Sequence, residues 1–196
     1  TNGLANSGWN GGGGISARWS NVSLVKIRAV GNRSGQNGGG IGIWECDLKL
    51  KDVLIKDNFA TNDGGGLHLQ YINNDLLNTN VRIIGNQSSN GGGLYYSHGL
   101  GNTGQVYELD GFEVVNNFAT NQGGGIFFGC WSGEADVQLS NSKVIGNRAT
   151  NQSGGIVVQS NNADFFFVND IIAKNESGYA GAMSINNSKA HFVHST

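Results

Sequence analysis

The sequence of 196 residues has no proline, only two cysteines and one methionine, and few charges. Charged residues make up 13% of the chain, against about 25% in a typical soluble domain, and the formal net charge is -2. This composition lacks the clustered lysines and arginines that nucleic-acid binding requires. No apolar run approaches the roughly 20 residues of a membrane-spanning helix. We therefore expect no nucleic-acid partner and no membrane insertion by this segment.

The low content of cysteine, proline and helix-forming residues limits the possible folds and disulfide bonds. Cys46 and Cys130 are too few for a disulfide framework, and we expect free thiols or bridges to another chain. Helix-forming residues are sparse, whereas glycine reaches 33 residues. Collagen is excluded because there is no Gly-X-Y period and no proline. The absence of proline suits strands that donate their N–H groups to a neighbouring strand. The composition therefore favours strands over helices.

An internal repeat runs through the whole chain. Its two clearest copies, NFATNDGGGL from Asn58 and NFATNQGGGI from Asn117, begin 59 residues apart. In every copy an Asn precedes an apolar residue by eight or nine positions, and in five copies three glycines lie directly before that apolar residue. The repeated asparagines are Asn6, Asn32, Asn58, Asn86, Asn117, Asn147 and Asn175. Such regularity indicates a repeat that builds the fold rather than a binding motif used twice.

Within each unit the apolar residues alternate with a period of two. Residues 126–128, 137–139 and 143–145 illustrate three short strands separated by Asn, Ser and Gly. Unit length varies only between the first and second strands, as expected if insertions leave one side of a stack. The pattern predicts an all-β fold, a parallel β-helix (β-solenoid) of about seven coils stacked about 4.8 Å apart. Residues 1–196 would form a single domain, and we expect it to be a segment of a longer solenoid.

The repeated asparagines are expected to lie above one another at a bend. There each side chain can bond the asparagine of the next coil, satisfying buried groups that would otherwise cost roughly 1–3 kcal/mol each. Arg82, Glu113 and Lys143 occupy another shared repeat position in three consecutive coils. Their alternating signs are typical of a solvent-exposed charge ladder.

The glycine motif also resembles a known family. GGG followed by Ile or Leu, with an Asn six residues before the first Gly, is similar to right-handed parallel β-helix repeats of the pectin-lyase-like superfamily. The repeats look most like those of polymorphic outer-membrane proteins and adhesin-type surface proteins. Those proteins have Phe three residues before the Asn, where this chain has Ala29, Ile55, Ile83, Val114, Val144 and Ile172. The resemblance implies a right-handed helix and an extracellular or cell-surface location. Other members of the superfamily cleave acidic polysaccharides.

One position of the repeat should point to solvent, yet in several units it holds an apolar residue rather than a charged one. It directly follows the core aliphatic residue of each unit, and two tryptophans lie a few residues beyond it. The candidate ligand or interface residues on this surface are His68, Tyr95, Phe127, Val157, Trp44 and Trp131. Exposed aromatic rings suit sugar rings and also protein interfaces. Alternatively, the insertion at residues 97–107 folds back and covers the row.

No motif identifies a catalytic, metal or cofactor site. GLGNTG at residues 99–104 matches GxGxxG but lies in the longest insertion, without the strand and helix that a dinucleotide site needs. The acidic residues share no repeat position, and the four histidines show no metal-ligand spacing. We therefore expect no catalytic residue, no metal and no cofactor.

These observations favour an extracellular structural or adhesive β-solenoid, as a surface protein or the building block of a filament. Its partners would be other copies or further coils stacked end to end, with carbohydrate or a host surface as additional candidates. The alternative is a carbohydrate-binding or polysaccharide-cleaving module, because one fold can carry many functions.

Overall fold

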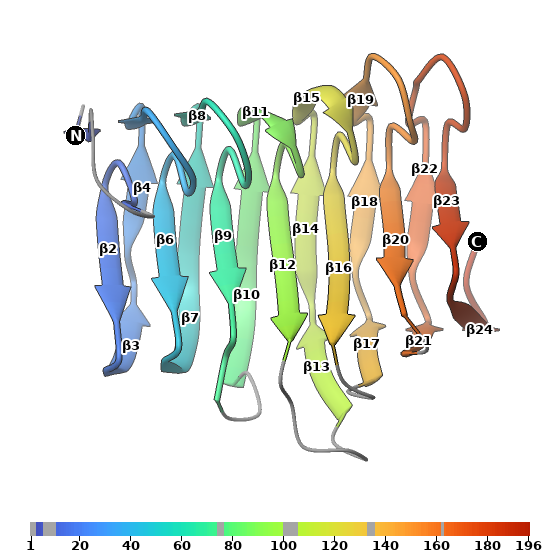
Figure 1. Cartoon of the computed structure of the whole chain (residues 1–196), viewed down its shortest axis with the longest axis horizontal. Helices are drawn as coiled ribbons and strands as arrows, with labels where there is room; N and C mark the ends of the chain where they lie inside the picture. Colours follow the sequence, from blue (N-terminus) through green and yellow to red (C-terminus); the bar gives the residue numbers. More distant parts are fainter. Residues whose placement is uncertain (1–2, 6–10, 74–76, 100–105, 133–135, 162) are drawn as a thin grey trace.

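The computed structural model describes residues 3–5, 11–73, 77–99, 106–132, 136–161 and 163–196. This part of the chain contains strands and turns but no helix, wound into a parallel β-solenoid (Figure 1). The predicted fold class is confirmed. The prediction of seven coils is one too many, because the solenoid has about six turns. A turn is the stretch of chain from one front strand to the next, and the front sheet has seven strands.

The front sheet in Figure 1 takes one short strand from each coil. Its strands are parallel and in register, with Ile41 beside Leu67 and Leu94 beside Ile126. They are β2 (Ile15–Arg18), β6 (Ile41–Trp44), β9 (Leu67–Gln70), β12 (Leu94–Gly99), β16 (Ile126–Ser132), β20 (Ile156–Ser160) and β23 (Met183–Asn186).

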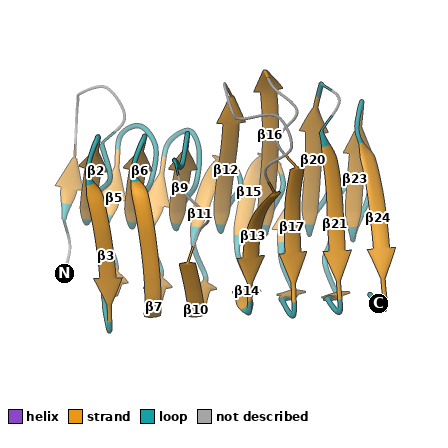
Figure 2. Ribbon diagram, turned by 90° about the horizontal axis from the view of Figure 1, so that it is seen from below, coloured by secondary structure: helices purple, strands orange, loops and turns teal. Residues whose placement is uncertain are grey.

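The rear sheet runs behind the front sheet, and Figure 2 shows the two layers along the length of the molecule. Its strands are β3 (Asn21–Val25), β4 (Arg28–Val30), β7 (Asp47–Lys56), β10 (Leu77–Ile84), β14 (Phe112–Val115), β18 (Lys143–Ile145) and β22 (Ile171–Ala173). In the C-terminal half a separate lower sheet continues it, formed by β13 (Val106–Asp110), β17 (Asp136–Ser140), β21 (Asp164–Val168) and β24 (Lys189–Val193).

A narrow corner sheet links the rear strands back to the front strands. Its members are β1 (Leu4–Ala5), β5 (Arg33–Ser34), β8 (Phe59–Ala60), β11 (Gln87–Asn90), β15 (Phe118–Gln122) and β19 (Arg148–Ala149). In the N-terminal half a coil runs through a front, a rear and a corner strand, and in the C-terminal half a lower strand comes between the front and rear strands. The three strands predicted for a unit, such as residues 126–128, 137–139 and 143–145, are front, lower and rear strands, and the corner strand was not predicted.

The space between the layers is filled by side chains from alternate strand positions. Ile41 in the front sheet and Leu48 in the rear sheet are buried in one continuous cluster that extends to Phe128. Full burial of such a side chain contributes about 1.5–3 kcal/mol relative to exposure. Cys46 and Cys130 belong to the same cluster and are free cysteines, which confirms that they do not form a bridge with each other.

The asparagine ladder is confirmed. From Asn32 to Asn147, the Nδ2 atom of each member lies 2.9–3.0 Å from the Oδ1 atom of the member in the next coil. The ladder links Asn32, Asn58, Asn86, Asn117, Asn147 and Asn175. Asn6, the first predicted member, lies outside the described residues.

Asn117 shows how one member of the ladder connects three coils. Its Nδ2 group donates to the Ile83 carbonyl and to Asn147 Oδ1, both at 2.9 Å. Its Oδ1 atom accepts from the Asn86 backbone N–H at 2.8 Å and from Asn86 Nδ2 at 2.9 Å. All polar atoms of this buried side chain are therefore satisfied, which removes the desolvation penalty of placing an amide inside the fold.

The stacked glycines allow turns of neighbouring coils to approach closely. Gly64 has φ +64°, a left-handed conformation that favours glycine. A Cβ atom at Gly65 would lie 2.4 Å from the carbonyl oxygens of Gln87 and Gly92 in the next coil. The glycine column is thus required by the distance between coils.

A second polar column lies at the bend between the lower and rear sheets near the C-terminus. Ser142 Oγ accepts from the Phe112 backbone N–H at 2.9 Å, and Asp170 Oδ1 accepts from the Ser142 backbone N–H at 2.8 Å. Asp170 Oδ2 is buried and has no hydrogen-bond partner among the described residues. Burial raises the pKa of Asp170 to about 7, although backbone hydrogen bonds act in the opposite direction.

Replacing Asn117 with alanine should lower the free energy of unfolding by roughly 3–5 kcal/mol, because the Ile83 carbonyl and two donors of Asn86 lose their partners. Chemical denaturation followed by circular dichroism measures the change. Asn151→Ala is the control: Asn151 is exposed and donates to Asn121 Oδ1, so the loss should stay below about 0.5 kcal/mol. Equal losses in both variants would contradict a special role for the buried ladder.

Asp170→Asn should stabilise the protein increasingly as the pH rises above about 4. The raised pKa means that the protonated carboxyl favours the folded state, and this contribution is lost as pH rises from the ordinary value of 3.8 through about 7. The variant keeps the acceptor for Ser142 without the charge. Its melting temperature should match that of the wild type near about pH 4 and exceed it near about pH 8. A difference that does not vary with pH would refute this account.

Candidate functional site

The aromatic row predicted to be exposed is buried, so that prediction is wrong. The exposed fractions of its side chains are 1% for His68, 3% for Phe127, 0% for Val157 and 2% for Trp44, while Tyr95 is half-buried. Trp131 belongs to β16, but its side chain lies outside the part of the chain that the structure describes. The four buried side chains of the row therefore offer no open platform for a ligand or a second chain.

Glycine turns lie over this row. A Cβ atom at Gly64 would be 2.9 Å from His68 Cβ, and one at Gly123 would be 3.2 Å from Phe127 Cβ. Beneath these turns the rings stack along the solenoid, with centroid distances of 5.1 Å from His68 to Tyr95 and 4.9 Å from Tyr95 to Phe127. The row is thus a second packed layer outside the main core. Residues 100–105, within the insertion expected to cover it, lie outside the described residues.

Burial favours the neutral form of three titratable side chains in the interior, His68, His98 and Cys130. Burial lowers the pKa of His68 to about 3 and lowers that of His98 as well. Burial raises the pKa of the Cys130 thiol to about 12. A neutral imidazole that is not in contact with solvent and a protonated thiol are poorly suited to acid–base or nucleophilic chemistry. These three side chains therefore do not indicate a reactive site.

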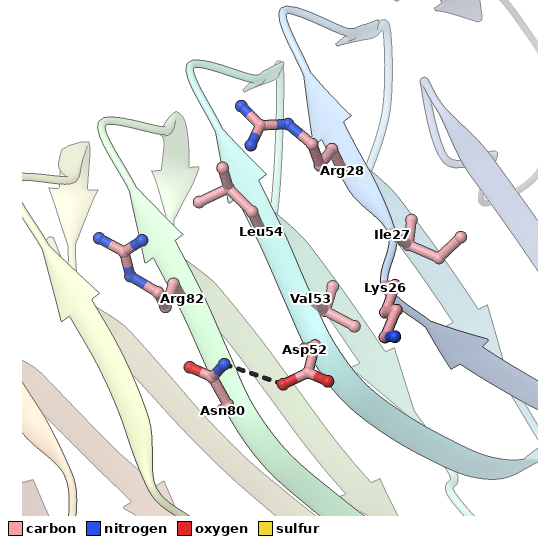
Figure 3. A pocket seen from close by; sticks show the side chains of 8 residues that line it. All are labelled: Lys26, Ile27, Arg28, Asp52, Val53, Leu54, Asn80 and Arg82. Carbon is pink, nitrogen blue, oxygen red and sulfur yellow. Dashed lines mark hydrogen bonds between the residues drawn. The ribbon is translucent and has the colours of Figure 1, made fainter.

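The outer face of the rear sheet carries a shallow groove with a volume of about 280 Å³ (Figure 3). In Figure 3 Arg28 and Arg82 lie on either side of Leu54. The residues that line the groove are Lys26, Ile27, Arg28, Asp52, Val53, Leu54, Asn80 and Arg82. It thus combines an aliphatic floor with a largely basic rim, and we call it the basic groove.

A repeated bend in the chain positions the basic groove. Lys26, Asp52 and Asn80 occupy the same place in three consecutive coils and have φ values of 55°, 53° and 54°. This left-handed conformation turns each strand by the same amount, so the bends align. The Asn80 side chain donates to Asp52 Oδ1 at 2.9 Å along this line.

The charges in the basic groove are mostly uncompensated. Arg28 and Arg82 are each in register with Leu54, so they lie two strand spacings apart, about 9.6 Å. Arg82 Nε is 2.7 Å from Glu113 Oε2, which confirms the first step of the predicted charge ladder. Lys26 and Arg28 form no ion pair within the described residues. Arg82 is opposed by Glu113, whereas Lys26 and Arg28 are opposed within the lining only by Asp52, and these two side chains favour an anionic ligand.

The structure reveals a second depression, of about 400 Å³, at the corner after the first front strands. It is lined by Trp19, Ser20, Asn21, Glu45 and Asn73. Sequence reasoning identified neither this depression nor the basic groove, because their residues share no type from coil to coil. The only available signal was the occurrence of basic residues at corresponding positions, Arg28 and Arg82.

Three further observations bear on function. Within the described residues, no three His, Cys, Asp or Glu side chains come together as a metal-binding group. No helix in this part of the chain is long and apolar enough to cross a membrane. Comparisons with known proteins gave no match to a family model, a curated protein or a solved structure. Functional inference therefore depends on the geometry of the chain itself.

Phe127→Ala should lower the free energy of unfolding by about 3–4 kcal/mol, because a buried ring is removed from a stacked row. Thermal or chemical unfolding measures the effect. Phe59→Ala is the control: this ring is half-buried under Arg33, whose guanidinium carbon lies 3.9 Å from the ring centroid, and the loss should be smaller. An unchanged unfolding transition for Phe127→Ala would return this row to the set of ligand candidates.

Proposed function

We propose that this chain is a structural or adhesive β-solenoid that acts outside the cell and has no catalytic activity of its own. The observation that carries this proposal is the continuous ladder from Asn32 to Asn175, which connects successive coils through the interior. Coils held in this way form a rod with side chains at fixed spacing on its faces. A rod of this kind can hold other molecules at a fixed distance or make contact with a surface along its length.

The absence of catalysis is proposed on chemical grounds. His68, His98 and Cys130 are buried in their neutral forms. The depressions on the surface are shallow, whereas efficient catalysis requires groups aimed at a reacting atom in a site that excludes water. The adhesin-like resemblance of the repeats supports an extracellular or cell-surface location in this proposal.

We further propose that the last coil stacks on a further coil or on a second copy. Its strands β22, β23 and β24 are each at the edge of a sheet, with a hydrogen-bonded neighbour on one side. Ile171, Ile185 and Phe192 are exposed on this coil. Open strand edges that carry apolar side chains favour pairing with another chain or coil.

Electron microscopy and sedimentation velocity of the intact chain test this role. End-to-end particles whose length grows with protein concentration are expected. A strictly monomeric protein at high concentration would argue against stacking. Release of unsaturated uronate products from acidic polysaccharides in the presence of Ca²⁺ would overturn the proposed absence of catalysis.

A second candidate function is carbohydrate binding, and the basic groove favours it. Its aliphatic floor at Leu54 suits the apolar face of a sugar ring, while Arg28 and Arg82 can bind carboxylate groups. Their spacing of about 9.6 Å is close to the length of a disaccharide unit. The ligand class on this reading is an acidic polysaccharide.

Replacing Arg28 and Arg82 together with glutamine should weaken binding of polygalacturonate by at least about fivefold at low salt, because two exposed cations are lost. Binding should also weaken as salt is added. Lys143→Gln is a matched control, since Lys143 is in register with Glu113 in the same row but does not line the groove. Wild-type protein that does not bind the polysaccharide, or an equal loss in the control, would remove this candidate.

A further inference from the structure

One corner of the solenoid presents an exposed tryptophan whose orientation is fixed. Trp19 directly follows β2, and 71% of its surface is exposed. Its indole Nε1–H donates to Glu45 Oε2 at 2.7 Å, and the Arg18 guanidinium carbon lies 4.9 Å from its ring centroid. These contacts hold the ring in place although it faces solvent. A ligand would therefore lose little affinity to ordering this side chain.

The fold does not explain why tryptophan occupies this corner. Trp19, Glu45 and Tyr71 follow three consecutive front strands and have φ values of 52°, 49° and 54°. A left-handed conformation is unfavourable for a bulky residue and easier for asparagine or glycine. The equivalent corner of the last coil has Asn187, at φ 50°. A strained tryptophan with an exposed ring is thus better explained by binding than by folding.

The depression beside the ring is lined by polar side chains. Apart from Trp19, it is lined by Ser20, Asn21, Glu45 and Asn73, which supply a hydroxyl, two amides and a carboxylate. An aromatic face next to such groups matches a pyranose ring, which has an apolar C–H face and a rim of hydroxyls. A protein interface would instead be expected to bury several large apolar groups together.

Main-chain hydrogen bonds keep this corner rigid. The Trp19 backbone N–H donates to the Trp44 carbonyl at 3.2 Å, and the Asn73 backbone N–H donates to the Cys46 carbonyl at 3.0 Å. The three coils that contribute to the depression are thus joined through their backbones. Side chains far apart in the sequence are held at fixed positions around it.

We propose that the corner formed by Trp19, Glu45 and Asn73 binds a neutral saccharide, with one pyranose ring stacked on Trp19. Sugar hydroxyls donate to the Glu45 carboxylate and accept from the amides of Asn21 and Asn73. The ligand is neutral because Glu45 lines the depression and repels a carboxylated sugar. No lysine or arginine is part of that lining, and Arg18 lies over the Trp19 ring, with its guanidinium carbon 4.9 Å from the ring centroid. This site is separate from the basic groove and goes beyond the structural role proposed above.

A second sugar ring can be accommodated along the same corner. Tyr71 is half-buried and lies two strand spacings from Trp19, about 9.6 Å. The saccharide would then run along the solenoid axis, past Glu45. The geometry favours a short oligosaccharide segment over a single sugar.

Isothermal titration of the intact chain with cellotriose, xylotriose and mannotriose tests the proposal. At least one should bind, and Trp19→Ala should weaken that binding by about tenfold or more, because the stacking surface is lost. Trp19→Phe should cause a smaller loss because it keeps a ring. Glu45→Gln should weaken binding by about three- to fivefold, since a charge-assisted hydrogen bond is lost while an acceptor for the Trp19 indole remains.

Two controls make the result specific. Tyr179→Ala removes another exposed ring, 80% exposed and in the last coil, and should leave binding unchanged. The Arg28→Gln, Arg82→Gln variant should also bind the trisaccharide normally, so that failure of the basic groove and failure of this site can be told apart. Melting temperatures equal to that of the wild type show that each variant is folded. The proposal is overturned if no trisaccharide binds, if Trp19→Ala has no effect, or if trigalacturonate binds as tightly as the neutral sugars.

Discussion

Main-chain hydrogen bonding between successive coils is the constraint on which the rest of this structure depends. It sets the coil spacing at about 4.8 Å and places residues of the same repeat position beside one another in consecutive coils. A polar side chain placed inside can therefore find its partner in the next coil. Asn117 does so, accepting from Asn86 and donating to Asn147, and the same arrangement repeats along the rod. Asparagine suits this position because its amide oxygen accepts from the preceding coil while its amide nitrogen donates to the following coil.

The same constraint determines where the chain can bend. Where consecutive coils bend at the same position, the strands on both sides of the bend stay in register. Lys26, Asp52 and Asn80 share one left-handed bend, and Trp19 and Glu45 share another. The first bend makes the outer face of the rear sheet concave, and the second turns side chains outward at a corner. Both depressions that suit a ligand are thus consequences of how the coils turn.

Interior and surface have different roles in this molecule. Inside, titratable groups such as His68 and Cys130 are neutral, and their burial serves packing. Outside, charged and aromatic side chains at the bends vary from coil to coil, because they are not constrained by a neighbour of the same type. Arg28, Leu54 and Arg82 share one register position but differ in chemistry. Recognition is therefore expected where the repeat permits variation.

The sequence alone determined the parallel β-solenoid, the asparagine ladder and the absence of a bridge between Cys46 and Cys130. These follow from local periodicity, which main-chain pairing converts directly into stacked columns. Only the tertiary structure decided that His68 and Phe127 are buried. A sequence period of two assigns residues to the two faces of a strand, but it does not show that a glycine turn covers the outer face. The tertiary structure also decided the number of turns and both depressions. The side chains around Trp19 and Arg28 come from different coils, and only the stacking brings them together.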